Sequence, residues 1–185
     1  MSQEWTIEAI VAATFPLLVV LTVLELWGGL VLDGSKAVLT RYPSLLTLVP
    51  GIIAVAGNLG SVLASRLSTA FHLGTLSFDP ADDALVGNAA ATFALAGTLF
   101  PAVGAGAWLA RYALGDAALS LVTVVFVATA SGLLLAVVAV AIATTATYAA
   151  FRLRLDPDDV VVPVVTTTCD VLGVVVFLLV VGATV

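Results

Sequence analysis

The sequence predicts an all-α integral membrane protein with five transmembrane helices. Of the 185 residues, 62% are hydrophobic and only 10% are charged, whereas about 25% of the residues of a typical soluble globular protein are charged. The apolar residues form five long runs with few charges, and about 20 helical residues suffice to cross ~30 Å of hydrocarbon. Break signals of Gly, Pro and charged residues bound the runs. We therefore expect one transmembrane domain over residues 1–185.

The five helices follow from these runs in chain order. They are expected over about residues 7–32, 44–65, 84–109, 118–151 and 160–185. The break signals are, in the same order, Asp33-Gly34, Arg41-Tyr42-Pro43, Asp79-Pro80, Gly115-Asp116 and Asp156-Pro157. The first run is too long for a cleavable signal peptide, so we expect it to remain as a helix. The fourth is ~50 Å long by helical rise and must tilt or extend into water.

The composition argues against several classes of function. The net charge is −6, whereas nucleic-acid-binding surfaces are basic, so we expect a lipid bilayer and no nucleic acid as partner. The single cysteine, Cys169, rules out an internal disulfide and a metal cluster built from cysteines. The sequence has no Gly-rich phosphate loop, HExxH motif or plausible Ser-His-Asp set, so we do not expect an enzyme.

Charge does not decide the orientation in the membrane. Three basic residues flank the helices on each side, namely Arg66, Arg152 and Arg154 on the N-terminal side and Lys36, Arg41 and Arg111 on the other. No internal repeat of about 20–50 residues occurs, so a pseudo-twofold transporter would need a second chain. The single lysine beside abundant Ala, Val and Asp favours a salt-loving source organism.

A carboxylate in the middle of the last helix is the strongest candidate for a functional site. Asp170 follows Val160 by ten residues, which is about 15 Å along a helix and half of a ~30 Å slab. Thr166 and Thr167 share its helix face. A charge at that depth costs at least ~2.5 kcal/mol. No Lys or Arg lies at a comparable depth in any predicted helix, so Asp170 favours a bound metal ion over a buried salt bridge.

The second helix carries a matching stripe of small and oxygen-bearing residues, which are Pro50, Ala54, Gly57, Asn58, Ser61 and Ser65. Asn58 lies near mid-depth, where its amide can bind a cation or hydrogen-bond another helix. Gly57 indicates a close backbone approach. For the two threonines of the last helix, a polar seam between packed helices is as good an explanation as a metal site.

Four other polar residues are weaker candidates. Glu25 lies about 24 Å along the first helix from Ala9 by helical rise, nearer the far headgroups. It either guards an entrance or is a partly solvated acid at the interface. Asn88 is expected to cap the third helix, and His72 is expected to be exposed in the loop after the second. Cys169 points away from the neighbouring carboxylate and is expected to be a small packing residue.

Two segments resemble the membrane domain of the MgtE family of magnesium transporters and of its eukaryotic solute-carrier relatives. The first is Pro50-Gly-Ile-Ile-Ala-Val-Ala-Gly-Asn-Leu-Gly60, continuing to Ala64-Ser-Arg66-Leu, which is similar to that family's Pro, Gly-Asn-x-Gly and Arg-Leu pattern. The second is Leu155-Asp-Pro followed by Pro163-Val-Val-Thr-Thr-Thr-Cys-Asp170-Val-Leu-Gly173, which resembles its last-helix Pro-x-x-Thr-x-x-x-Asp-x-x-Gly element. An MgtE-like transmembrane domain of five helices is the fold that the resemblance implies.

The resemblance also implies roles for individual residues. Asp170 would be the pore carboxylate that contacts hydrated Mg²⁺, with the backbone oxygen of Thr166 nearby and with Asn58 and Ser61 on the wall formed by the second helix. The N-terminus would be cytoplasmic, and the protein would be located in the cell (plasma) membrane. Ser61-Val62 stands where family members usually have Asn-Gln, which weakens the side-chain contact. We expect no cytosolic sensor or CBS domain.

The eukaryotic relatives contain two such repeats, so this chain is expected to form a homodimer or to pair with a second half-size chain. Proteins usually bind Mg²⁺ through one or two carboxylates and retained water, and two copies would supply two Asp170 side chains. The first hypothesis is therefore Mg²⁺ transport along a dimer interface lined by the second and fifth helices. The alternatives are a Na⁺- or H⁺-coupled Mg²⁺ exchanger and a non-transporting membrane subunit that needs a partner half. The sequence does not distinguish Mg²⁺ from Mn²⁺ or Co²⁺ as the transported ion.

Overall fold

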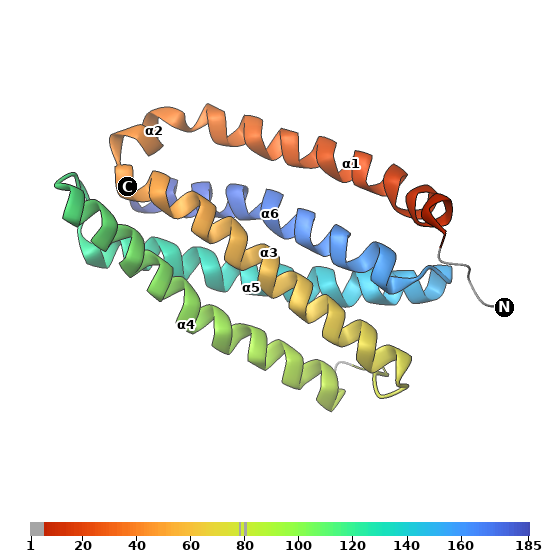
Figure 1. Ribbon diagram of the computed structural model, residues 1–185. Coiled ribbons are helices and arrows are strands. Elements are labelled where there is room, and N and C mark those ends of the chain that lie inside the picture. The colour runs from red at the N-terminus through yellow and green to blue at the C-terminus, as the bar shows by residue number, and fades with distance from the viewer. Residues whose placement is uncertain (1–5, 78, 80) are drawn as a thin grey trace.

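The computed structural model describes residues 6–77, 79 and 81–185, and every regular element in these residues is an α-helix (Figure 1). The helices are α1 (Ile7–Gly34), α2 (Lys36–Arg41), α3 (Pro43–His72), α4 (Asp83–Leu114), α5 (Leu121–Leu153) and α6 (Pro157–Thr184). Five of them are long and apolar enough to span a membrane. The predicted all-α membrane fold with five spans is confirmed.

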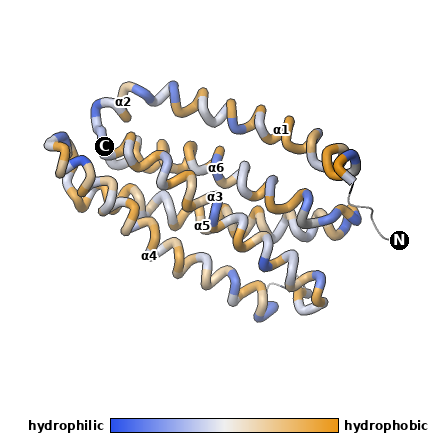
Figure 2. Tube along the Cα trace, in the orientation of Figure 1, coloured by the Kyte–Doolittle hydropathy of each residue, from blue (hydrophilic) through white to orange (hydrophobic). Residues whose placement is uncertain are grey.

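The hydrophilic residues gather mainly at helix ends and turns, and apolar residues follow the length of the five long helices (Figure 2). This is the distribution expected for helices whose middle parts lie in hydrocarbon, because lipid offers no hydrogen bonds to polar side chains. The long helices have 25 to 33 residues in their candidate spans. They therefore exceed the ~20 residues that a bilayer requires and must tilt or extend beyond it.

Several helix ends differ from the predicted ones. α3 continues to His72 rather than ending near Ser65, because Leu67 is buried and anchors the last turns in the bundle. His72 is thus the exposed last residue of a helix and not a loop residue. The short helix α2 was not predicted, since its six residues are too few to produce a periodic pattern.

Side-chain caps fix the start of two helices. Asp82 accepts hydrogen bonds from the backbone N–H groups of Ala84 at 2.8 Å and Leu85 at 3.2 Å at the start of α4, and Ser120 accepts one from Thr123 at 3.1 Å at the start of α5. The expectation that Asn88 caps α4 is therefore wrong. Asn88 lies inside the helix, and its side chain faces α3.

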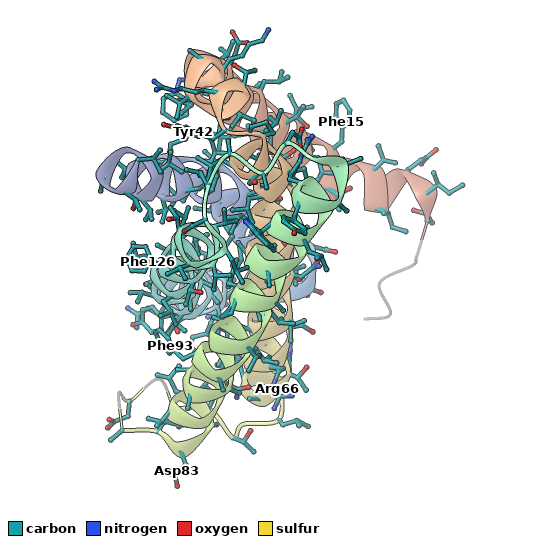
Figure 3. The ribbon with its side chains drawn as sticks, turned by 90° about the vertical axis from the view of Figure 1, so that its left-hand side faces the viewer. Phe15, Tyr42, Arg66, Asp83, Phe93 and Phe126 are labelled. Carbon is teal, nitrogen blue, oxygen red and sulfur yellow. The ribbon has the colours of Figure 1, made fainter. Side chains whose placement is uncertain are left out.

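α3 is the central helix of the bundle, since it contacts α2, α4, α5 and α6. α1 lies at one edge and contacts only α2 and α6, and Figure 3 shows its first part leaning away from the other helices. A proline inside α1, Pro16, is the ordinary cause of such a bend. Most of α1 is exposed, so lipid or another chain must cover it in a membrane.

Candidate functional site

The two motifs of the sequence meet where α3 packs against α6. A Cβ atom added to Gly57 would overlap Asp170 Oδ1, and one added to Gly60 would lie 2.8 Å from Cys169 Sγ and 3.0 Å from Val165 Cγ1. Both distances are shorter than a normal contact, so only glycine permits this approach. The predicted close backbone approach at Gly57 is confirmed, and the atom that occupies the space is the candidate carboxylate.

Asp170 has an unsatisfied oxygen. Its Oδ1 atom is buried and has no hydrogen-bond partner, although the side chain as a whole is only partly buried. Among the residues that the structure describes, no Lys or Arg forms a salt bridge with it. A buried carboxylate oxygen without a partner is costly, and the same carboxyl group lines a pocket in which a ligand could offset that cost. A cation is the ligand whose charge would satisfy it.

A second carboxylate lies next to this position. Thr167 Oγ1 donates a hydrogen bond to Glu25 Oε1 of α1 at 3.1 Å, and Thr167 precedes Asp170 by three residues on the same helix face. Glu25 and Asp170 both line one pocket of ≈ 240 Å³ between α1, α3 and α6. The expected difference in depth between Glu25 and Asp170 is therefore wrong, because α1 packs against α6 with Glu25 near the level of Thr167.

Two glycines of α1 complete the wall of this pocket and were not predicted. Gly28 and Gly29 follow Glu25 by three and four residues and line the same pocket. A Cβ atom on Gly28 would lie 3.5 Å from Val171 Cγ2, an ordinary contact distance, so α1 packs against α6 at this point. The i+3 and i+4 spacing from a carboxylate was the available signal.

The predicted stripe on α3 divides between two neighbouring faces. Gly57 faces α6, whereas Pro50, Ala54, Asn58 and Ser65 are exposed. Ser61 is partly buried, and its hydroxyl donates to the backbone oxygen of Asn58 at 3.0 Å. Neither Asn58 nor Ser61 lines the pocket that holds Asp170. Asn58 lies on the open face of α3, defined here by the four exposed residues Pro50, Ala54, Asn58 and Ser65, and Ser61 lies beside this face.

The other polar residues of α6 near Asp170 pack against α3 or hydrogen-bond within their own helix. Cys169 is buried against Gly60, as expected of a packing residue. A methyl carbon of Thr166 would lie 3.4 Å from a Cβ on Gly57, so this side chain borders the contact with α3. Thr168 donates to the backbone oxygen of Val164 at 2.6 Å. Of the three consecutive threonines, Thr167 alone has its hydroxyl bonded to a carboxylate.

The site can hold a hydrated metal ion. In the described part of the chain no three His, Cys, Asp or Glu side chains gather as a metal-binding group, so an ion at the two carboxylates would keep several water ligands. Six waters occupy ~180 Å³ at about 30 Å³ each, which fits within the pocket of ≈ 240 Å³. Oxygen ligands with retained water suit small, hard divalent cations.

The chain matches the model of a known protein family. The model of the family MgtE, described as divalent cation transporter, matches residues 49–180, which is more than half of the chain. The matched segment contains Gly57 and Asp170, whereas Glu25 lies before it. No solved structure matches the chain.

Proposed function

This chain belongs to the MgtE family of divalent cation transporters, and we propose that it carries Mg²⁺ across the plasma membrane through a site centred on Asp170. It is a multi-pass membrane protein, with five candidate spans among the residues that the structure describes. The observation that carries the proposal is that the carboxyl groups of Asp170 and Glu25 line one pocket, with Asp170 Oδ1 buried and unpartnered. Uncompensated charge in hydrocarbon is costly, and a passing cation removes that cost.

The proposed ligand set follows from what surrounds this atom. Glu25 supplies a second carboxylate in the same pocket, and Thr167 holds Glu25 through its hydroxyl. The backbone oxygen of Thr166 would add a further ligand on α6. Two carboxylates that face one cavity repel each other when both are charged, and a divalent ion cancels both charges. This favours doubly charged cargo over Na⁺ or K⁺.

We further propose that the chain is a single membrane domain and that it works as a homodimer, with the pathway between copies lined by α3 and α6. The open face of α3 supports this, because it lies beside the Asp170 contact and carries Asn58. In the dimer, Asn58 and Ser61 would form the wall of the pathway. The same arrangement puts the N-terminus in the cytoplasm, which labelling of cysteines introduced into the loops on intact cells would test.

The test is divalent-cation flux into liposomes that contain only this chain. We expect Mg²⁺ uptake by the wild type and loss of uptake in Asp170→Asn. Asp159→Asn is the matched control, because it makes the same chemical change on the same helix at an exposed position. Full uptake by Asp170→Asn would refute the assignment of the site.

The same preparation separates the alternatives. Uptake that requires an opposing Na⁺ or pH gradient would identify a coupled exchanger. A chain that is inert alone and active with a second half-size chain would be a subunit of a heterodimer. Parallel assays with Mn²⁺ and Co²⁺ would define the cargo.

A further inference from the structure

A second polar group lies at the contact between α3 and α4, away from the carboxylate site. Arg66 Nε donates a hydrogen bond to Asn88 Oδ1 at 2.5 Å, and Asn88 Nδ2 donates to the backbone oxygen of Ala84 at 2.7 Å. The amide of Asn88 is thus held in one orientation and fixes one edge of the guanidinium group. Among the described residues, no carboxylate forms a salt bridge with Arg66, so its terminal amino groups are available to an external anion.

Two pockets adjoin this pair, and they differ in polarity. Both are lined by Arg66 and Asn88. The first, of ≈ 310 Å³, adds the hydroxyl-bearing residues Ser65, Thr69 and Thr75. The second, of ≈ 140 Å³, is mainly apolar and includes Leu59, Leu63 and Leu95. The two pockets meet at Arg66 and Asn88, and we call the pair, with its polar end and its apolar end, the Arg66 groove.

The polarity of the groove follows its depth in the membrane. Arg66 follows Gly57 by nine residues, which is about 13 Å along the helix. Since Gly57 contacts the midplane candidate Asp170 and half of the hydrocarbon slab is ~15 Å, Arg66 lies near its edge. Figure 3 shows Arg66 near the end of α3, at the same end of the bundle as Asp83 at the start of α4. Leu59 and Leu63 lie deeper, within the acyl chains.

We propose that the Arg66 groove binds one anionic phospholipid, with its phosphate on the guanidinium of Arg66 and one acyl chain along the apolar end. A guanidinium matches the oxygen pairs of a phosphate. The order from hydroxyl-bearing residues through Arg66 to apolar residues is that of a phospholipid from its polar headgroup through the phosphate to the tail. A soluble phosphate would leave the apolar end empty, and diacylglycerol would leave Arg66 without an anion. The groove thus requires both parts of the lipid.

The experiment compares three ligands on the wild-type chain by native mass spectrometry in detergent. Phosphatidylglycerol carries both the phosphate and the acyl chains, diacylglycerol lacks the phosphate, and glycerol phosphate lacks the acyl chains. We expect only phosphatidylglycerol to be retained as one bound lipid per chain at low micromolar concentration. Equal retention of diacylglycerol, or displacement of the lipid by equimolar glycerol phosphate, would overturn the proposal. All three measurements use the wild-type chain, so the result does not depend on whether a variant folds.

Two variants then test whether the lipid binds in the Arg66 groove. Arg66→Gln removes the charge, and a charge-assisted hydrogen bond of ~1.5 kcal/mol corresponds to about tenfold weaker binding of phosphatidylglycerol. Ala91→Trp fills the apolar end of the groove and should weaken the binding of phosphatidylglycerol without changing Arg66. Arg152→Gln is the matched control, because Arg152 lies on the same side of the membrane over the ring of Tyr148, at 5.8 Å, and lines neither pocket of the groove.

Two outcomes of the variants would contradict the proposal. Unchanged retention of phosphatidylglycerol by Arg66→Gln would show that the lipid is held elsewhere. A change from dimer to monomer in Arg66→Gln and Ala91→Trp, with no lipid bound to the wild type, would show that a second copy of the chain covers the groove.

Discussion

Gly57→Ala tests whether the close approach of α3 to Asp170 positions the carboxylate. The added methyl group would overlap Asp170 Oδ1 and lie 3.2 Å from Asp170 Cγ and 3.4 Å from Thr166 Cγ2. The carboxylate must therefore rotate or α3 must move away from α6. Either movement changes the position of the proposed ligand by a large part of an ångström.

Two opposing terms set the effect of Gly57→Ala on stability. Alanine is more favourable than glycine inside a helix by about 1 kcal/mol, whereas overpacking of a tight contact costs about 1–3 kcal/mol. The free energy of unfolding should thus fall by no more than about 2 kcal/mol, and the protein should still fold. Function should suffer much more, since a ligand displaced by ~1 Å can lower activity by ~100-fold.

The assay is Mg²⁺ flux in liposomes, normalised to the folded protein recovered after reconstitution. The control is Gly97→Ala in α4, where a Cβ atom would have no neighbour within 4 Å. It should keep wild-type flux and gain helix stability. If Gly57→Ala also transported at the wild-type rate, the contact between Gly57 and Asp170 would have no role in the site, and the geometric argument would be wrong.

Three further predictions address other parts of the structure. Thr167→Val removes the hydroxyl that donates to Glu25 and should weaken Mn²⁺ binding several-fold in a titration; unchanged affinity would argue against a role for Glu25. Hydrogen bonds to Asp82, above all from the Ser77 side chain, lower the pKa of its carboxyl group from 3.8 to about 2. The stabilisation is therefore complete above pH 3.8 and lost as the pH falls through about 2. Asp82→Asn should accordingly lower the melting temperature at pH 7, with the difference vanishing near pH 2, and a pH-independent difference would contradict this. Phe100 is fully buried, so Phe100→Ala should lower the free energy of unfolding by about 3–5 kcal/mol. A decrease of less than about 1 kcal/mol, measured by unfolding in detergent, would be inconsistent with this packing.

The close approach at Gly57 and the place of Asp170 along its helix could be predicted from the sequence, because each depends on one helix alone. Helical rise converts the distance from Val160 into a depth for Asp170, and a glycine among bulky residues indicates close approach. The choice of Asp170 as the candidate residue follows from these local rules. The structure adds that the two residues meet each other.

The position of Glu25 could not be predicted, because it depends on how α1 and α6 are offset along the membrane. No local pattern fixes that offset, and a helix longer than the bilayer can tilt or shift. The pair formed by Arg66 and Asn88 was missed for a related reason. Each residue had an ordinary explanation at a helix end, and only the packing of α3 against α4 brings them together.

The most direct test of the central claim is Mn²⁺ binding to the purified chain, measured by electron paramagnetic resonance in lipid nanodiscs. Mn²⁺ accepts the same carboxylate and water ligands as Mg²⁺. Wild type and Asp159→Asn should bind an ion that retains several water ligands and is displaced by Mg²⁺, and Asp170→Asn should not bind it. If Asp170→Asn bound Mn²⁺ with wild-type affinity and spectrum, Asp170 would not be the ligand at the centre of the pathway.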